Sequence, residues 1–226
     1  YASIKELSNQ KSNIYKKSYL EKSRSYYSEY IAGTWSPKSI LFNKEVLLIA
    51  PGNTTEIHKK GVEEFILKKK PIVVVLNNLN KIDESLIDFR IACHPIRIFS
   101  DLAKYKTFSQ PLIAPISSLK KWSKKKIEFP TFDFGLQVKE NIFKYDDKSC
   151  IIPYPLAMAY ALAILNSGNS KLIYLVGFDG YKNGDKRSFQ VEHIWNIYNK
   201  GMDNKKIISL TETSYNIEKS SLYSFL

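Results

Sequence analysis

Four short polar segments follow apolar runs in this chain, and their residue types suit the binding of a small polar ligand. Pro51-Gly52-Asn53-Thr54-Thr55 comes directly after VLLIA, and Asn77-Asn78 follows a second aliphatic run. Cys93-His94-Pro95 and Gly177-Phe178-Asp179-Gly180-Tyr181 stand in the same position after two later runs. Glycine lets a backbone approach a ligand closely, and threonine can cap a helix or donate to a phosphate. We therefore expect a small-molecule cleft where these segments meet.

Each segment also has a plainer interpretation. The first matches neither GxGxxG nor GxxxxGK[ST], and a tight turn followed by a helix cap has much the same composition. A loop asparagine is often only a turn residue, and a single histidine is more often a packed neutral side chain than a catalyst. Asp146-Asp147 is followed by no further ligands at useful spacing, so we expect no metal site. The G-x-S-x-G motif of a Ser/His/Asp hydrolase is absent from the sequence.

The apolar runs before these segments predict strands. Continuous apolar runs without alternation are typical of strands buried on both faces, and they occur at residues 45–50, 71–77, 86–94, 111–116, 171–181 and 206–213. Helices are predicted at 55–70, 155–168 and 186–201, the first with Ile57, Val62, Phe65 and Ile66 on one face. This alternation predicts an α/β fold, a Rossmann-like, doubly wound domain with a mainly parallel sheet.

The N-terminal part of the chain differs from the rest. Residues 1 to about 35 carry aliphatic and tyrosine residues at loose helical spacing, and Gly33 and Pro37 then end the pattern. We expect a helical arm and linker over residues 1–38 and one Rossmann-like domain over 39–226. The chain opens on Tyr1 instead of Met, so we expect it to be part of a longer protein.

Composition narrows the class of protein. Hydrophobic residues make up 44% of the 226 residues and charged residues 25%, as in ordinary globular domains. No apolar run approaches the roughly 20 residues of a transmembrane helix, and no signal peptide is recognisable. Cys93 and Cys150 stand beside aliphatic residues, so we expect buried free thiols in a reducing, cytoplasmic compartment.

The net charge of +12 comes almost entirely from lysine. Arginine, which recognises bases and phosphates through bidentate geometry, is limited to Arg24, Arg90, Arg97 and Arg187. The lysines are scattered in short clusters between apolar runs. A solvated lysine-rich surface is therefore expected, and specific nucleic-acid binding is not.

Four stretches resemble a known family in order and spacing. VLLIAPGNTTEI, VVVLNN, ACHPI and PLAMAYALAILNSGNSKLIYLVGFDGYKNG are similar to the bacterial CMP-sialic-acid sialyltransferases and to their relatives, the motility accessory factors and the archaeal-type hydroxymethylpterin pyrophosphokinases. The resemblance covers residues 45 to 215. It is most specific at 155–181, where IYLVGFDGY is close to the family pattern I-Y-L-x-G-x-D-x-Y.

The resemblance implies a domain that binds a CMP-linked acidic sugar, with no metal and no cofactor, and transfers the sugar to a glycan acceptor of the bacterial surface. Tyrosine hydroxyls would hold the leaving phosphate in place of a metal. The residues implied at the nucleotide site are Gly52, Asn53, Thr54, Asn77, His94, Tyr154, Gly177, Asp179 and Tyr181. An aldolase-like domain is implied before Tyr1. Peripheral attachment at the inner membrane and oligomerisation are left open.

The chain also departs from the family pattern. Asn53-Thr54 stands where Pro-Ser is common, and Pro153-Tyr154-Pro155 replaces a Thr-Ser-Gly helix start. The stretch from Phe189 to Lys206 is short for the lid that carries the family's catalytic histidine. His193 falls there within a predicted helix, so we expect it to pack or face solvent, and we assign no catalytic residue.

Three functions therefore remain in competition. The first is a metal-independent glycosyltransferase of surface-glycan synthesis. The second is a non-catalytic nucleotide-binding or docking module attached to an aldolase-like domain, which the short lid favours. The third is pyrophosphoryl transfer, which needs carboxylates that hold Mg²⁺ and for which the sequence offers no convincing pair.

Overall fold

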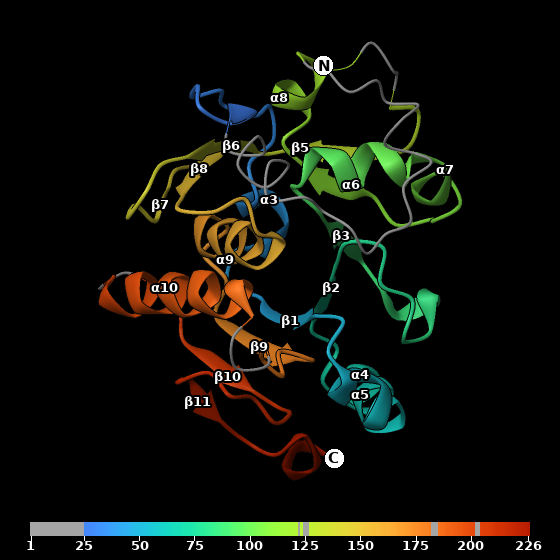
Figure 1. Cartoon of the computed structure of the whole chain (residues 1–226). Coiled ribbons are helices and arrows are strands. Elements are labelled where there is room, and N and C mark those ends of the chain that lie inside the picture. Colours follow the sequence, from blue (N-terminus) through green and yellow to red (C-terminus); the bar gives the residue numbers. More distant parts are fainter. Residues whose placement is uncertain (1–24, 122, 124–126, 182–184, 202–203) are drawn as a thin grey trace.

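The structure is a computed structural model that describes residues 25–121, 123, 127–181, 185–201 and 204–226. The described residues form an eight-stranded sheet in the order β11-β10-β9-β1-β2-β3-β4-β5, with every neighbouring pair parallel. Its strands are β1 (Glu45–Ile49), β2 (Ile72–Leu76), β3 (Phe89–Ile91), β4 (Leu112–Ala114), β5 (Thr131–Asp133), β9 (Leu172–Val176), β10 (Ile207–Ser209) and β11 (Glu218–Lys219). In Figure 1 the sheet runs from β5 at the top to β11 at the bottom.

Helices cover both faces of this sheet. In Figure 1, α9 (Ala157–Ser167) and α10 (Lys186–Lys200) lie on the left of the sheet. The helices on the right are α4 (Asn53–Ile57), α5 (Lys59–Lys69), α6 (Pro95–Ser100) and α7 (Leu102–Tyr105). Because side chains alternate along a strand, Val46 and Leu48 of β1 join the core with α9, and Leu47 joins the core with α5. The predicted Rossmann-like α/β fold is confirmed.

The helix predicted at 55–70 is two helices, α4 and α5, because the backbone departs from helical geometry at His58. Ile57 ends α4 and is 64% exposed, so the prediction that it lies on the buried face is wrong. The other three residues predicted on that face, Val62, Phe65 and Ile66, are buried against the sheet.

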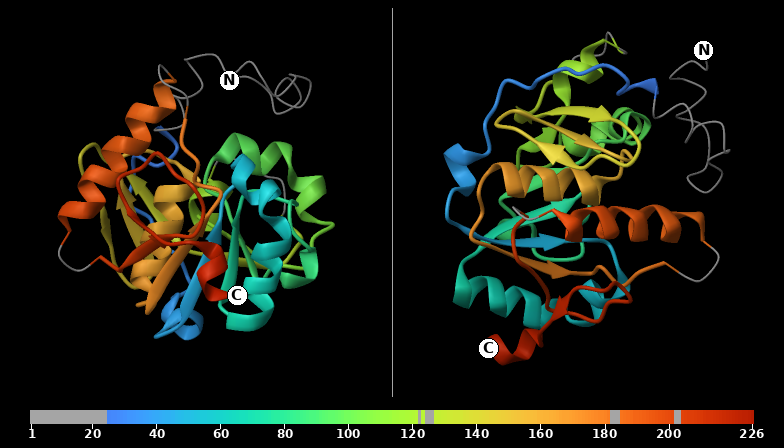
Figure 2. Two further views of the ribbon diagram at one scale, coloured as in Figure 1. Left: turned by 90° about the horizontal axis from the view of Figure 1, so that it is seen from below. Right: turned by 90° about the vertical axis from the view of Figure 1, so that its left-hand side faces the viewer.

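Helix α9 is enclosed on all sides. Every residue from Met158 to Ser167 is buried, which explains why this helix is apolar around its whole circumference. The large sheet covers one side of α9, while α10 and a small second sheet contribute side chains to the same core. The right-hand view of Figure 2 shows α9 between the small sheet and α10.

The small sheet was not expected from the sequence. It has the order β6-β8-β7, from β6 (Gly135–Val138), β7 (Lys144–Tyr145) and β8 (Ser149–Ile152). Strands of two to four residues are too short to produce a periodic signal, and polar residues interrupt them. The same shortness hides α3 (Lys38–Leu41), α8 (Ile116–Lys120) and η2 (Leu222–Phe225). A short helix, η1 (Glu84–Leu86), precedes β3. Cys93 and Cys150 are buried free thiols, as predicted.

Most of the helix expected to about residue 35 falls on residues 1–24, which lie outside the described residues. Ser25 is helical, and residues 26–37 form turns and irregular segments, so the expected helix does not continue to residue 35. The backbone of this segment bonds to strand edges, as in the donation from Gly33 N to the carbonyl of Lys148 at 3.0 Å. Tyr27 is 1% exposed, and its hydroxyl donates to the carbonyl of Cys93. These external partners satisfy the polar groups that a helix would satisfy internally. Figure 2 shows the segment, in blue, passing along the small sheet.

Candidate functional site

The strand order identifies where a ligand is expected. From β1 the chain moves outward through β2, β3, β4 and β5, then returns to β9 on the other side of β1 and continues to β10 and β11. The order therefore reverses between β1 and β9. Open parallel sheets bind ligands outside the carboxyl ends of the strands at such a reversal. The segments after β1 and β9 are consequently the first candidates.

These two segments touch each other. Gly52 N donates to the carbonyl oxygen of Gly177 at 3.0 Å. A Cβ atom on Gly52 would overlap that oxygen and lie 2.5 Å from Asp179 Oδ1. Gly177 has a φ of +76°, which favours glycine as well. Both glycines therefore have a structural reason: they let the two loops approach each other closely.

The carboxylate of Asp179, which follows β9, contacts the first turn of α4. Its carboxylate accepts a hydrogen bond from Thr54 N at 3.1 Å and a second from the Thr54 hydroxyl. Thr54 Oγ1 also lies 3.1 Å from Thr211 Oγ1, and the Thr55 hydroxyl donates to the carbonyl of Ala50 at 2.8 Å. Donors that were expected to face a phosphate are thus satisfied by the protein itself.

Asn77 directly follows β2, and His94 lies three residues after the neighbouring strand β3, at the start of α6. Asn77 has a φ of 57°, a left-handed conformation that asparagine adopts more readily than most residues, and its N–H donates to the carbonyl of Ile91 at 2.8 Å. His94 Nδ1 is buried and has no hydrogen-bond partner among the described residues. Burial, with a smaller effect of Arg97, lowers the pKa of His94 to about 4. The ring is therefore neutral at pH 7.

Lys81 also lies at the carboxyl edge of the large sheet. No feature of the sequence separates it from the many other lysines of the chain. Its Nζ lies 3.3 Å from the carbonyl oxygen of Gly52 and 3.3 Å from Glu56 Oε2. The loop after β2 therefore reaches the loop after β1. Only contacts formed by folding could identify this residue.

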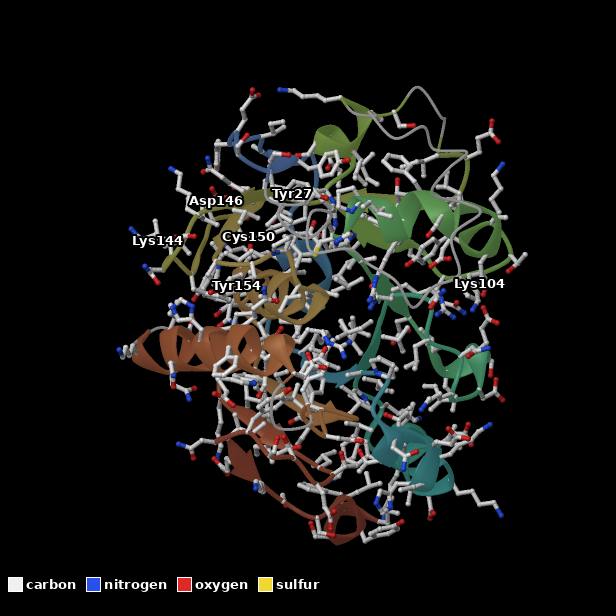
Figure 3. All side chains as sticks on the ribbon, viewed as in Figure 1. Tyr27, Lys104, Lys144, Asp146, Cys150 and Tyr154 are labelled. Atoms are coloured by element: carbon white, nitrogen blue, oxygen red, sulfur yellow. The ribbon has the colours of Figure 1, made fainter. Side chains whose placement is uncertain are left out.

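The two predicted tyrosines lie against α10 and its N-terminal residues. Tyr154 precedes α9, and its hydroxyl is 3.0 Å from Nδ1 of His193, with the two rings edge to face. Tyr181 is 38% exposed, and the guanidinium of Arg187 lies 4.5 Å from the centre of its ring. Figure 3 shows Tyr154 on the side of the sheet that carries α9 and α10. His193 packs against Tyr154, consistent with the packing role expected for it.

The predicted site residues thus fall into three groups. Gly52, Thr54, Gly177 and Asp179 are joined by direct contacts, with Asn53 exposed at the start of α4. Asn77 follows β2, and His94 lies at the start of α6 after β3. Tyr154 contacts His193, and Tyr181 contacts Arg187. The ligand roles of all nine stay a prediction.

Two features are absent from the described residues. No group of three or more His, Cys, Asp or Glu side chains within them is arranged to hold a metal ion. Within the same residues, no helix has both the length and the apolar character needed to cross a membrane.

Comparison with known proteins identifies the fold. No protein-family model matches the sequence, and no curated protein matches it. Among solved structures, the chain is similar to the MAf glycosyltransferase from Magnetospirillum magneticum AMB-1, with a TM-score of 0.61 and 10% identity over 92% of this chain. The chain spans 38% of that protein's length. At this identity the similarity concerns the fold alone.

Proposed function

We propose that this domain binds a nucleotide sugar, specifically a CMP-linked acidic sugar, and takes part in its transfer to a glycan acceptor in bacterial surface-polysaccharide synthesis. One observation carries the proposal: the segments after β1 and β9 meet where the strand order reverses, in a fold shared with a glycosyltransferase. This is the position at which Rossmann-like sheets bind nucleotides.

The residues around that position offer suitable chemistry. Asn53 and Asn77 carry amides that can bond a base or a ribose, and the partly exposed, neutral ring of His94 lies at the same edge. The leaving phosphate would be stabilised by donors at the same edge, Tyr154 or Tyr181 among them. The net charge of +12 favours an anionic ligand. A general base that takes the proton of the acceptor hydroxyl is part of the proposed reaction and is not assigned to a residue.

A second function is favoured by the contacts of Asp179. Its carboxylate bonds both the N–H and the hydroxyl of Thr54, donors that a nucleotide phosphate would otherwise use. Under this alternative the domain is a non-catalytic module that docks to an aldolase-like domain. Both functions belong in the cytoplasm, at or near the inner membrane.

Nucleotide binding separates the two functions. Thermal unfolding is measured with CMP, CDP, UDP and ATP, because a ligand at 100 times its Kd adds about 2.7 kcal/mol to the free energy of unfolding. We expect CMP to raise the melting temperature most. If none of the four nucleotides raises the melting temperature, the glycosyltransferase-like function is refuted and the docking module is favoured.

The variant Asn77→Gly makes the test specific to the site. Glycine retains the left-handed backbone at φ 57° and removes only the amide, whereas alanine would add strain. The matched control is Asn43→Gly, at φ 54° in an exposed turn before β1, on the opposite edge of the sheet. We expect the CMP response to be lost in Asn77→Gly and retained in Asn43→Gly.

A further inference from the structure

We infer that Lys81 provides the positive charge that binds the phosphate of the ligand at the carboxyl edge of the sheet. This inference rests on the proposed function and deepens it, because it names the cation that holds the phosphate. Lys81 was not among the residues expected from the sequence or from the resemblance to a known family.

The position of the ammonium group is the first argument. Lys81 lies on the loop after β2, and its Nζ is 3.3 Å from the carbonyl oxygen of Gly52 in the loop after β1. Its side chain is 27% exposed, so the group is held against the protein and still reaches solvent. An ammonium has three N–H donors, and the contacts with Gly52 and Glu56 account for two of them. One donor therefore remains for a ligand at this edge.

The local charge explains why such a group is needed. The carboxylate of Asp179 fills the first turn of α4, so an anionic ligand would be repelled from the place where helix N–H groups usually bind phosphate. Glu56, on the same helix, adds a second negative charge. A side-chain cation beside the loop after β1 would offset these charges for a bound phosphate.

Lys81 is better placed for this than Arg187, the cation beside Tyr181. Nε and Nη2 of Arg187 donate to the two carboxylate oxygens of Asp185, and the guanidinium stacks on Tyr181, so its charge is paired through several contacts. The partner of Lys81 is Glu56, whose side chain is 70% exposed and makes a single ion-pair contact at 3.3 Å. Exposed ion pairs of this kind are weak. A phosphate can therefore displace Glu56 from Lys81.

The test compares CMP with cytidine, which lacks the phosphate, by isothermal titration calorimetry on the full chain. We expect the wild type to bind CMP more tightly than cytidine. Lys81→Gln should weaken CMP binding about tenfold and leave cytidine binding unchanged, since a hydrogen bond to a charged group is lost. Glu56→Gln should tighten CMP binding about threefold, because the ammonium no longer shares its charge with a carboxylate.

The matched control is Lys171→Gln. Lys171 pairs with Glu45 at 3.4 Å beside the same two strands, β1 and β9, but at their amino ends. We expect this variant to bind CMP and cytidine as the wild type does. Lys81→Arg, which retains the charge, should restore most of the preference for CMP.

The outcomes separate this inference from the proposed function. If the wild type binds CMP and Lys81→Gln binds it within about twofold of the wild type, the role of Lys81 is refuted while the function stands. Equal weakening of CMP and cytidine would also refute it, since Lys81 would then act only by shaping the loop at Gly52. If the wild type binds neither CMP nor the other nucleotides, the inference and the proposed function fail together.

Discussion

Replacement of Asp179 tests whether its partly buried carboxylate holds the loops after β1 and β9 together. The carboxylate accepts hydrogen bonds from the N–H and the hydroxyl of Thr54, a residue that is 8% exposed. In Asp179→Ala the backbone N–H loses its acceptor, which costs about 1–3 kcal/mol for a buried donor. The hydroxyl still has Thr211 Oγ1 at 3.1 Å, so its loss is smaller. We expect the free energy of unfolding to fall by about 2–3 kcal/mol.

Urea denaturation followed by circular dichroism measures this change in the free energy of unfolding. Two further variants serve as a comparison and a control. Asp179→Asn retains one acceptor oxygen and should cost about 1 kcal/mol. The control is Asp83→Ala, which removes an exposed carboxylate that caps η1 through Ser85 N at 2.9 Å and should cost about 0.5 kcal/mol.

A double-mutant cycle with Thr54→Val isolates the hydroxyl contact, with an expected coupling of about 1 kcal/mol. The reasoning is refuted if Asp179→Ala costs no more than Asp83→Ala and its effect is additive with that of Thr54→Val. In that case the two loops would be held by backbone contacts alone.

Two further predictions concern the core and the pH dependence of stability. Tyr27→Phe leaves the buried carbonyl of Cys93 without its donor and should lower the free energy of unfolding in urea by about 1–2 kcal/mol; an unchanged midpoint would contradict the buried contact. Burial lowers the pKa of His94 to about 4, below its value of about 6.5 in the unfolded chain, so the unfolded state binds more protons between these values. The contribution of neutral His94 to the free energy of unfolding should therefore be fully present above about pH 6.5 and fall by at most about 3 kcal/mol towards pH 4. In urea titrations at pH 7.5 and 4.5, His94→Asn should lose less stability on acidification than the wild type. Equal losses of stability on acidification in the wild type and in His94→Asn would refute this prediction.

The sequence by itself determined the central layers of this protein. EVLLI and IVVVL became β1 and β2, and the apolar stretch around Met158 to Ser167 became α9. The reason is local: a strand or helix buried on all sides must be apolar at nearly every position, and that pattern can be read without knowing its neighbours. The four polar segments could likewise be placed at strand ends, because each follows such a run directly.

Only the tertiary structure decided what those polar segments contact. Thr54 and Asp179 are 125 residues apart in the sequence, yet the return of the chain to β9 beside β1 places their side chains in hydrogen-bond contact. The same folding brings Lys81 to the carbonyl of Gly52 and inserts Tyr27 into the core. A hydrogen-bond partner depends on the path of the whole chain and not on neighbouring residues, so the sequence could identify polar groups at the edge of the sheet but not which of them the protein satisfies by itself.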